Sequence, residues 1–141
     1  MRISDVLRGK GAEVLTVAPS TPVAELIRQL SERNIGALPV VDDGRVVGIV
    51  SERDVVRQLH AGGAGVLQMK AADIMTTEVA ICSPSDSAAD LARVMTERRF
   101  RHLPVVVDGE LVGIVSIGDL VKTRIDQLER EREQLTSYIS G

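Results

Sequence analysis

Two Ser-x-x-Asp turns, Ser51 to Asp54 and Ser116 to Asp119, carry side chains that could bind a ligand. Each turn follows an apolar Gly-Ile-Val run, which predicts a strand leading directly into a helix. A helix N-terminus presents free N–H groups and partial positive charge, and both attract phosphate. The serine hydroxyl can donate to a phosphoryl oxygen, and the aspartate can accept both hydroxyls of a ribose. The pattern therefore suits a nucleotide.

The same side chains also fit a capping box. In that motif the serine oxygen accepts a backbone N–H, and the acidic residue three positions on accepts another. Either copy alone leaves both interpretations open. The duplication favours the ligand.

Each turn is part of a longer repeat. Residues 19–56 align with residues 84–121 without a gap, and twenty of the 38 pairs are identical. A unit of about sixty residues buries little of its own surface, so we expect the two copies to pack together. A two-fold-like arrangement would bring the two turns near one cleft.

The hydrophobic pattern predicts the order strand, helix, strand, strand, helix in each unit, an α/β (α+β) fold. Thr21 is the expected N-cap of the first helix, and Pro22 is its expected first residue. Asp43-Gly44 is a strong hairpin signal. In the first unit we expect strands at 15–18, 38–41 and 46–50, with helices at 22–30 and from 51 to about 59.

The repeat and its flanks divide the chain into four parts. We expect the first unit at 1–62, a glycine-rich linker at 63–72, the second unit at 73–125 and a helical tail at 126–141. The tail continues an apolar seam that is interrupted by Arg132. This seam predicts a homodimer or a partner helix, and a solvated tail is the alternative. The seam consists of Val121, Ile125, Leu128, Leu135 and Ile139.

Composition argues against several classes of function. Aromatic residues make up 1% of the chain and the net charge is −3, so neither stacking platforms nor a basic stripe for nucleic acid is expected. The single cysteine, Cys82, has no nearby histidine, and His60 and His102 lack metal-pair spacing. We therefore expect no catalysis, no metal and no covalent cofactor. With no apolar leader or membrane-spanning run, a cytoplasmic location is expected.

The repeat resembles the tandem CBS-domain pair, a family named after cystathionine β-synthase. The resemblance covers residues 3–125. It rests on the two Gly-Ile-Val-Ser-x-x-Asp turns and on three further motifs, namely Leu38-Pro39-Val40-Val41, Leu103-Pro104-Val105-Val106 and Asp73-Ile74-Met75-Thr76.

The resemblance implies two βαββα units with pseudo-two-fold symmetry that dimerise. It implies a non-catalytic sensor of adenosine-containing ligands, such as AMP, ADP, ATP, NAD or S-adenosylmethionine, that signals to a partner protein. The alternative is an interaction scaffold whose nucleotide sites are vestigial.

The resemblance also implies two composite sites. One would join Ile49, Ser51 and Asp54 to Asp86, Leu91, Phe100, Arg101 and His102. The other would join Ile114, Ser116 and Asp119 to Thr21, Leu26, Ile35, Gly36 and Ala37.

The two predicted sites differ where Arg101-His102 replaces Gly36-Ala37. Arginine and histidine supply charge-assisted donors to phosphate that glycine and alanine cannot. We therefore expect tighter phosphate binding at the site with Asp54. The alternatives are a surface charge for Arg101 and a half-buried polar residue for His102. For Arg53 both a ligand role and a solvated helix position stay open.

Overall fold

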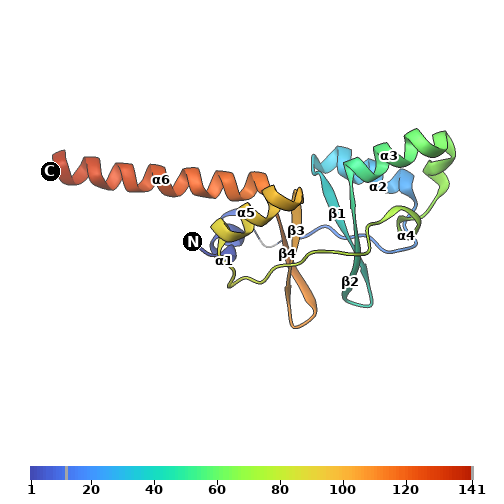
Figure 1. Ribbon diagram of the computed structural model, residues 1–141, viewed down its shortest axis with the longest axis horizontal. Helices are drawn as coiled ribbons and strands as arrows, with labels where there is room; N and C mark the ends of the chain where they lie inside the picture. The colour runs from blue at the N-terminus through green and yellow to red at the C-terminus, as the bar shows by residue number, and fades with distance from the viewer. Residues whose placement is uncertain (12, 141) are drawn as a thin grey trace.

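Two small halves lie side by side in the computed structural model, and one long helix projects from one of them (Figure 1). The structure describes residues 1–11 and 13–140. Each half contains a two-stranded antiparallel sheet covered by helices, so the expected α/β class is confirmed. The elements are α1 (Ile3–Lys10), α2 (Val23–Arg33), β1 (Ala37–Asp42), β2 (Arg45–Ser51), α3 (Glu52–Gly62), the 3₁₀ helix η1 (Gly63–Gln68), α4 (Ala71–Ile74), α5 (Ala88–Arg98), β3 (His102–Val107), β4 (Glu110–Ser116) and α6 (Ile117–Ser140).

Each sheet is a tight hairpin. Asp43 and Gly44 form the two-residue loop between β1 and β2, with φ angles of 52° and 79°. Asp108 and Gly109 repeat this loop with 51° and 83°. Positive φ at both loop positions defines the type I′ turn, whose twist matches that of the strands. The hairpin predicted from Asp43-Gly44 is confirmed.

The strand expected at 15–18 shrinks to one residue. Val17 forms an isolated parallel bridge beside β1, donating its N–H to the carbonyl of Pro39 (3.0 Å) and accepting from Val41 (2.8 Å). Cys82 makes the equivalent bridge beside β3. Only one residue pairs with each sheet because the chain crosses the sheet edge here on its way between the two halves.

The predicted cap of the first helix is wrong by one position. Helix α2 begins at Val23 with Pro22 as its N-cap, and no side chain caps it. The hydroxyl of Thr21 instead accepts the backbone N–H of Ala18 (3.1 Å). Because Thr21 closes this preceding turn, its oxygen is not available to the helix.

The chain exchanges elements between the halves. Ile3 and Val6 of α1 are buried in the second core, together with α5, β3 and β4. Ala71 and Ile74 of α4 are buried in the first core, beside α2, β1 and β2. Figure 1 shows both crossings, with α1 lying beside α5 and α4 beside β2. Each half is therefore completed by a short helix from beyond its own repeat.

Residues 63–72, expected as linker, are structured. Helix η1 spans most of them, and Val66 is buried in the first core at 2% exposure. The glycines around it permit the tight path, and Gly63 adopts a φ of 66°.

Helix α6 runs without a break from the second half into the predicted tail. Its N-terminal turn is anchored by Leu120, which is buried in the second core. Further along, the apolar seam is uncovered, and Leu135 and Ile139 are 64% and 81% exposed. Among the described residues, no helix combines the length and the apolar character needed to cross a bilayer.

Candidate functional site

Ser51 and Asp54 form a complete capping box at the start of α3. The backbone N–H of Ser51 donates to Oδ2 of Asp54 (2.8 Å), and so does the Ser51 hydroxyl (3.0 Å). The N–H of Asp54 donates back to the serine oxygen (3.3 Å). These bonds use only one carboxylate oxygen. Within the described part of the chain no hydrogen bond reaches Oδ1 of Asp54, so capping leaves an acceptor for a ligand.

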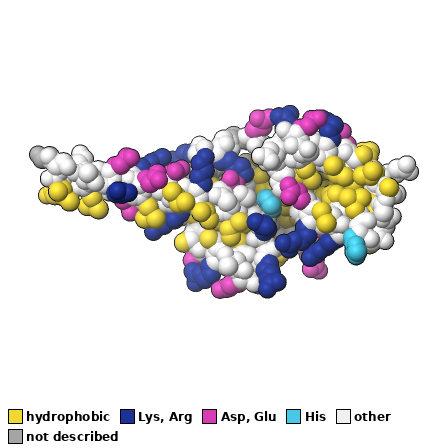
Figure 2. All heavy atoms as spheres, turned by 90° about the horizontal axis from the view of Figure 1, so that it is seen from above, with side chains coloured by type: hydrophobic (Ala, Val, Ile, Leu, Met, Phe, Trp, Pro, Cys, Tyr) yellow, Lys and Arg dark blue, Asp and Glu magenta, His cyan; other side chains and the backbone are white. Residues whose placement is uncertain are grey.

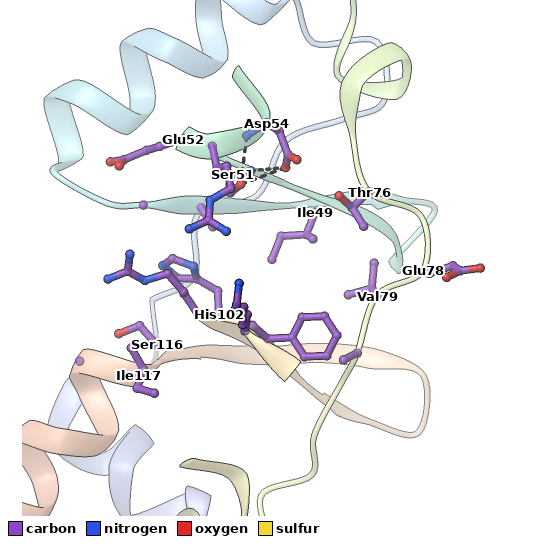
Figure 3. Close-up of a pocket in the computed structure, with 18 of the residues that line it drawn as sticks. Ile49, Ser51, Glu52, Asp54, Thr76, Glu78, Val79, His102, Ser116 and Ile117 are labelled. Atoms are coloured by element: carbon purple, nitrogen blue, oxygen red, sulfur yellow. Dashed lines mark hydrogen bonds between the residues drawn. The ribbon is translucent and has the colours of Figure 1, made fainter. Parts of the chain in front are cut away.

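A cavity of about 550 Å³ opens beside this turn, between the two halves. Figure 3 shows Ser51, Ile49 and Thr76 on one wall and His102, Ser116 and Ile117 on the other. The full lining is Gly36, Ala37, Ile49, Ser51, Glu52, Arg53, Asp54, Arg57, Thr76, Glu78, Val79, Ala80, Arg99, Phe100, Arg101, His102, Ser116, Ile117 and Gly118.

Four arginines line the cavity, namely Arg53 and Arg57 from α3 and Arg99 and Arg101 from the segment before β3. Lys and Arg side chains and one histidine gather near the middle of the molecule in the space-filling view (Figure 2). The N-termini of both α3 and α6 also reach the cavity. Guanidinium groups and helix N-termini together favour an anion.

His102 lies across the boundary between the halves. Its imidazole ring is 3.0 Å from the point where a Cβ on Gly36 would stand, so a side chain at Gly36 would meet the ring. Burial lowers the pKa of His102 below its usual 6.5, and the charges of Lys10 and Arg101 lower it further. The ring is therefore neutral at pH 7.

The second turn has the same cap but a different neighbour. Ser116 donates its N–H to Oδ2 of Asp119 (2.9 Å), and Asp119 donates back to the serine oxygen (3.0 Å). The ammonium of Lys10 lies 2.7 Å from the same Oδ2 and 2.8 Å from the carbonyl of Ile114. Burial would raise the pKa of Asp119, but the bonds from Lys10 and Ser116 outweigh it, so the pKa is lowered.

Comparison with known proteins identifies the family. A CBS-domain family model matches the chain twice, over residues 3–61 and 71–126. The chain belongs to the CBS-domain family.

Known relatives agree with this. The mitochondrial CBS domain-containing protein CBSX3 of Arabidopsis thaliana is 33% identical over 99% of this chain and 72% of its own length. A CBS-domain containing protein from Agrobacterium tumefaciens superposes with a TM-score of 0.84 at 42% identity, covering 88% of this chain and 99% of that one. The structure of CBSX2 in complex with AMP superposes with a TM-score of 0.75 at 30% identity, covering 89% and 96%.

The cavity brings together part of each predicted composite site. Residues predicted for both sites line this one cavity, and their role as ligand contacts stays a prediction. They are Ile49, Ser51, Asp54, Phe100, Arg101 and His102 from the first set, and Gly36, Ala37 and Ser116 from the second.

The other predicted residues lie outside the cavity. Leu26 is fully buried in the first CBS core, and Ile35 packs against that core. Leu91 packs against the second core, and the carboxylate of Asp86 accepts the N–H of Ser83 (2.8 Å). Thr21 closes the turn with Ala18 described above. The two that remain, Ile114 and Asp119, hold Lys10.

Sequence reasoning missed the wall formed after α4. Thr76 pairs with Ile49 through two backbone hydrogen bonds (2.9 and 3.0 Å), and the chain then continues along the cavity as Val79 and Ala80. The motif Asp73-Ile74-Met75-Thr76 could have indicated this wall, because it places a family-specific residue just before an irregular segment. Arg57 was also missed, although it lies one helical turn after Arg53.

Nothing in the described residues groups three or more His, Cys, Asp or Glu side chains in a way that could hold a metal ion. Burial, with a smaller contribution from Asp86, raises the pKa of the Cys82 thiol to about 12. A thiol that stays protonated at neutral pH is a poor nucleophile.

Proposed function

We propose that this CBS pair is a non-catalytic regulatory module that binds an adenosine-containing nucleotide in the cavity beside Ser51 and Asp54. The cavity carries the proposal, because it combines a free carboxylate oxygen, four arginines and two helix N-termini in one space. Its volume of about 550 Å³ lies within the range of small-molecule sites. The AMP complex of the related CBSX2 supports the choice of ligand class.

Each part of a nucleotide has a matching surface. The ribose hydroxyls can donate to Oδ1 of Asp54, which the cap leaves free. The apolar side chains of Ile49, Val79 and Phe100 can enclose an adenine. The arginines can neutralise the phosphates, and Arg101 is the most direct candidate because it precedes β3 at the boundary between the halves.

Ligand binding would act on the relative position of the halves. The cavity is lined by β2 and α3 from one half and by β3 and α6 from the other. A ligand that contacts both walls stabilises the arrangement of the two halves that lets it touch both walls at once. A partner protein can distinguish that arrangement from the others. The identity of that partner is open.

Calorimetric titration tests the proposal. The full chain is titrated in parallel with AMP, ADP, ATP, NAD and S-adenosylmethionine, and saturable binding of at least one is expected. The 2′,3′-dideoxy form of the tightest nucleotide should bind about one to two orders of magnitude more weakly, because hydrogen bonds to a charged group contribute about 1.5–3 kcal/mol. Absence of binding by all five ligands would leave the scaffold alternative.

The exposed seam of α6 supports self-association as the second part of the function. Ile125 and Ile139 fall at heptad a positions, and Leu128 and Leu135 fall at d. In a parallel coiled coil, β-branched residues at a with leucine at d favour a dimer of two helices. A single charged residue at an a position, such as Arg132, fixes how the two helices align along their length. This seam is also the observation that favours a scaffold.

One pair of variants tests the assembly. Leu135→Asp places a charge in the seam and should weaken the dimer at least about tenfold, measured by light scattering across a dilution series. Ser137→Asp adds the same charge at the outward f position and should leave the dimer intact. A wild-type chain that is monomeric at high micromolar concentration would rule out self-association through α6.

A further inference from the structure

The carboxylate of Asp119 has a fixed occupant that the carboxylate of Asp54 lacks. The Lys10 ammonium bonds to Oδ2 of Asp119 and to the carbonyl of Ile114 at once, at 2.7 and 2.8 Å. The two partners are only partly exposed, with 35% of the Lys10 side chain and 25% of the Asp119 side chain accessible. At the first turn, no basic side chain among the described residues forms an ion pair with Asp54.

The contacts of the two strand glycines show which residues of the two exchanged segments are equivalent. Met75 packs against the strand glycine Gly48, where a Cβ would stand 2.5 Å from the methionine sulfur. At the equivalent strand glycine, Gly113, the neighbour is Leu7, with its Cδ2 atom at 2.7 Å. Leu7 is therefore the counterpart of Met75, and Lys10 lies three residues further on, at the end of a helix that is longer than α4.

Backbone pairing differs in the same place. Ile49 uses both its N–H and its carbonyl to pair with Thr76, and this pairing forms one wall of the cavity. The carbonyl of Ile114, its counterpart in the second unit, is bound by Lys10 instead. Lys10 thus lies against both the carboxylate and the strand carbonyl of the second turn.

We propose that Lys10 closes the second Ser-x-x-Asp turn to nucleotide, so that each chain binds one nucleotide, at the Asp54 turn only. This proposal rests on the function proposed above. A ribose that binds the Asp119 carboxylate must compete with an ammonium that already neutralises this carboxylate and also bonds to the carbonyl of Ile114. The single residue Lys10 therefore sets the stoichiometry of a pair whose two turns are otherwise alike.

Binding stoichiometry tests the proposal, with AMP and ATP as the probes and calorimetry as the measurement. Wild type should bind one nucleotide per chain. Lys10→Met, which removes the ammonium and keeps a long side chain, should bind two, and Lys10→Ala should give the same opening without a bulky replacement. The double variant Lys10→Met/Asp119→Ala should return to one site. Lys10→Met/Asp54→Ala should keep only the newly opened site.

Each outcome is decisive. Two nucleotides per wild-type chain, or one per chain in both Lys10 variants, would overturn the closure by Lys10. If wild type binds none while Lys10→Met binds one, the closure stands and the proposed function of the Asp54 turn fails. If no variant binds either probe, both fail together. Because Lys10 lies at the exposed end of α1, thermal melts should show all single variants folded.

Discussion

The two Ser-x-x-Asp turns share one local structure and have different surroundings. In both, the serine N–H bonds to the aspartate Oδ2, at 2.8 Å in the first turn and 2.9 Å in the second. Asp54 then faces a cavity lined by four arginines, whereas Asp119 is held by Lys10. The capping box and the ligand site are thus not rival interpretations. Capping is common to both turns, and the difference lies in the neighbours, which are a cavity beside Asp54 and the Lys10 ammonium beside Asp119.

The difference begins in the short helices that the halves exchange. Helix α4 is followed by Thr76, which pairs with β2 and leads into the cavity wall. Helix α1 is followed by Gly11, whose φ of 98° turns the chain away after Lys10. Glycine tolerates this conformation without strain, whereas a threonine would not. The longer α1 therefore brings Lys10 to the second turn, whereas the shorter α4 ends early and the chain after it pairs with β2.

The largest expected effect comes from removing each carboxylate in turn. Asp54→Ala should weaken AMP binding about tenfold to a hundredfold, because it removes hydrogen bonds to a charged acceptor worth about 1.5–3 kcal/mol. Asp119→Ala removes the equivalent cap from the other turn and should leave AMP affinity unchanged. Calorimetry on the two variants measures this directly. Equal losses in both would show that the turns bind alike.

Arg101 provides a second, smaller contrast. It stands where the first unit has Gly36, and it is one of four arginines in the cavity. Arg101→Ala should weaken AMP about tenfold while adenosine binding stays the same, and added salt should narrow the gap. Arg98→Ala, which removes an arginine that does not line the cavity, is the matched control. A parallel loss for AMP and adenosine would assign the phosphate to backbone N–H groups and Ser51.

The serines separate capping from binding. Ser51→Ala and Ser116→Ala should each destabilise the fold by about 1 kcal/mol, the usual loss for an N-cap, and lower the melting temperature by a few degrees. Only Ser51→Ala should also weaken AMP, by about threefold to tenfold for one neutral hydrogen bond. Thermal melts and calorimetry on both variants provide the comparison. AMP affinity equal to wild type in Ser51→Ala would restrict that hydroxyl to capping.

The sequence predicted what depends on local chemistry. The Asp43-Gly44 loop, the helix start at Ser51 and the continuation of α6 follow from turn, cap and periodicity rules that act over a few residues. The exchange of α1 and α4 between the halves follows from none of them, because it depends on which apolar faces meet in three dimensions.

The same limit applies to the site. Ser51 could be placed at the cavity because a repeated motif marks it, and Arg101 and His102 because the family resemblance implies ligand contacts just before Leu103-Pro104. Lys10 carries no motif, and its partner Asp119 is 109 positions away along the chain. Only the folded structure brings them within 2.7 Å. A duplicated motif predicts two similar turns, but it does not predict a distant side chain that closes one of them.

The smallest expected effect is the pH response of His102, which has only Ala37 as its counterpart in the first unit. Its pKa is lowered by burial, then by Lys10 and Arg101, against smaller opposing effects from Asp119 and Glu52. A folded-state pKa below the unfolded value of about 6.5 means that the unfolded chain binds more protons in acid. The stability linked to His102 is therefore fully present above pH 6.5 and is lost as the pH falls below it.

Urea denaturation of the nucleotide-free protein is the cleaner measurement, because a nucleotide phosphate itself takes up a proton near pH 6. Between pH 7 and pH 5, wild type should lose stability through His102, because the unfolded chain binds the additional proton more readily. His102→Gln, which keeps a polar side chain without the titration, should lose correspondingly less over the same interval. If AMP draws a proton onto the ring, AMP affinity should rise as the pH falls. If the stability of wild type and of His102→Gln depends on pH in the same way, the His102 ring between the two halves does not cause the loss of stability in acid.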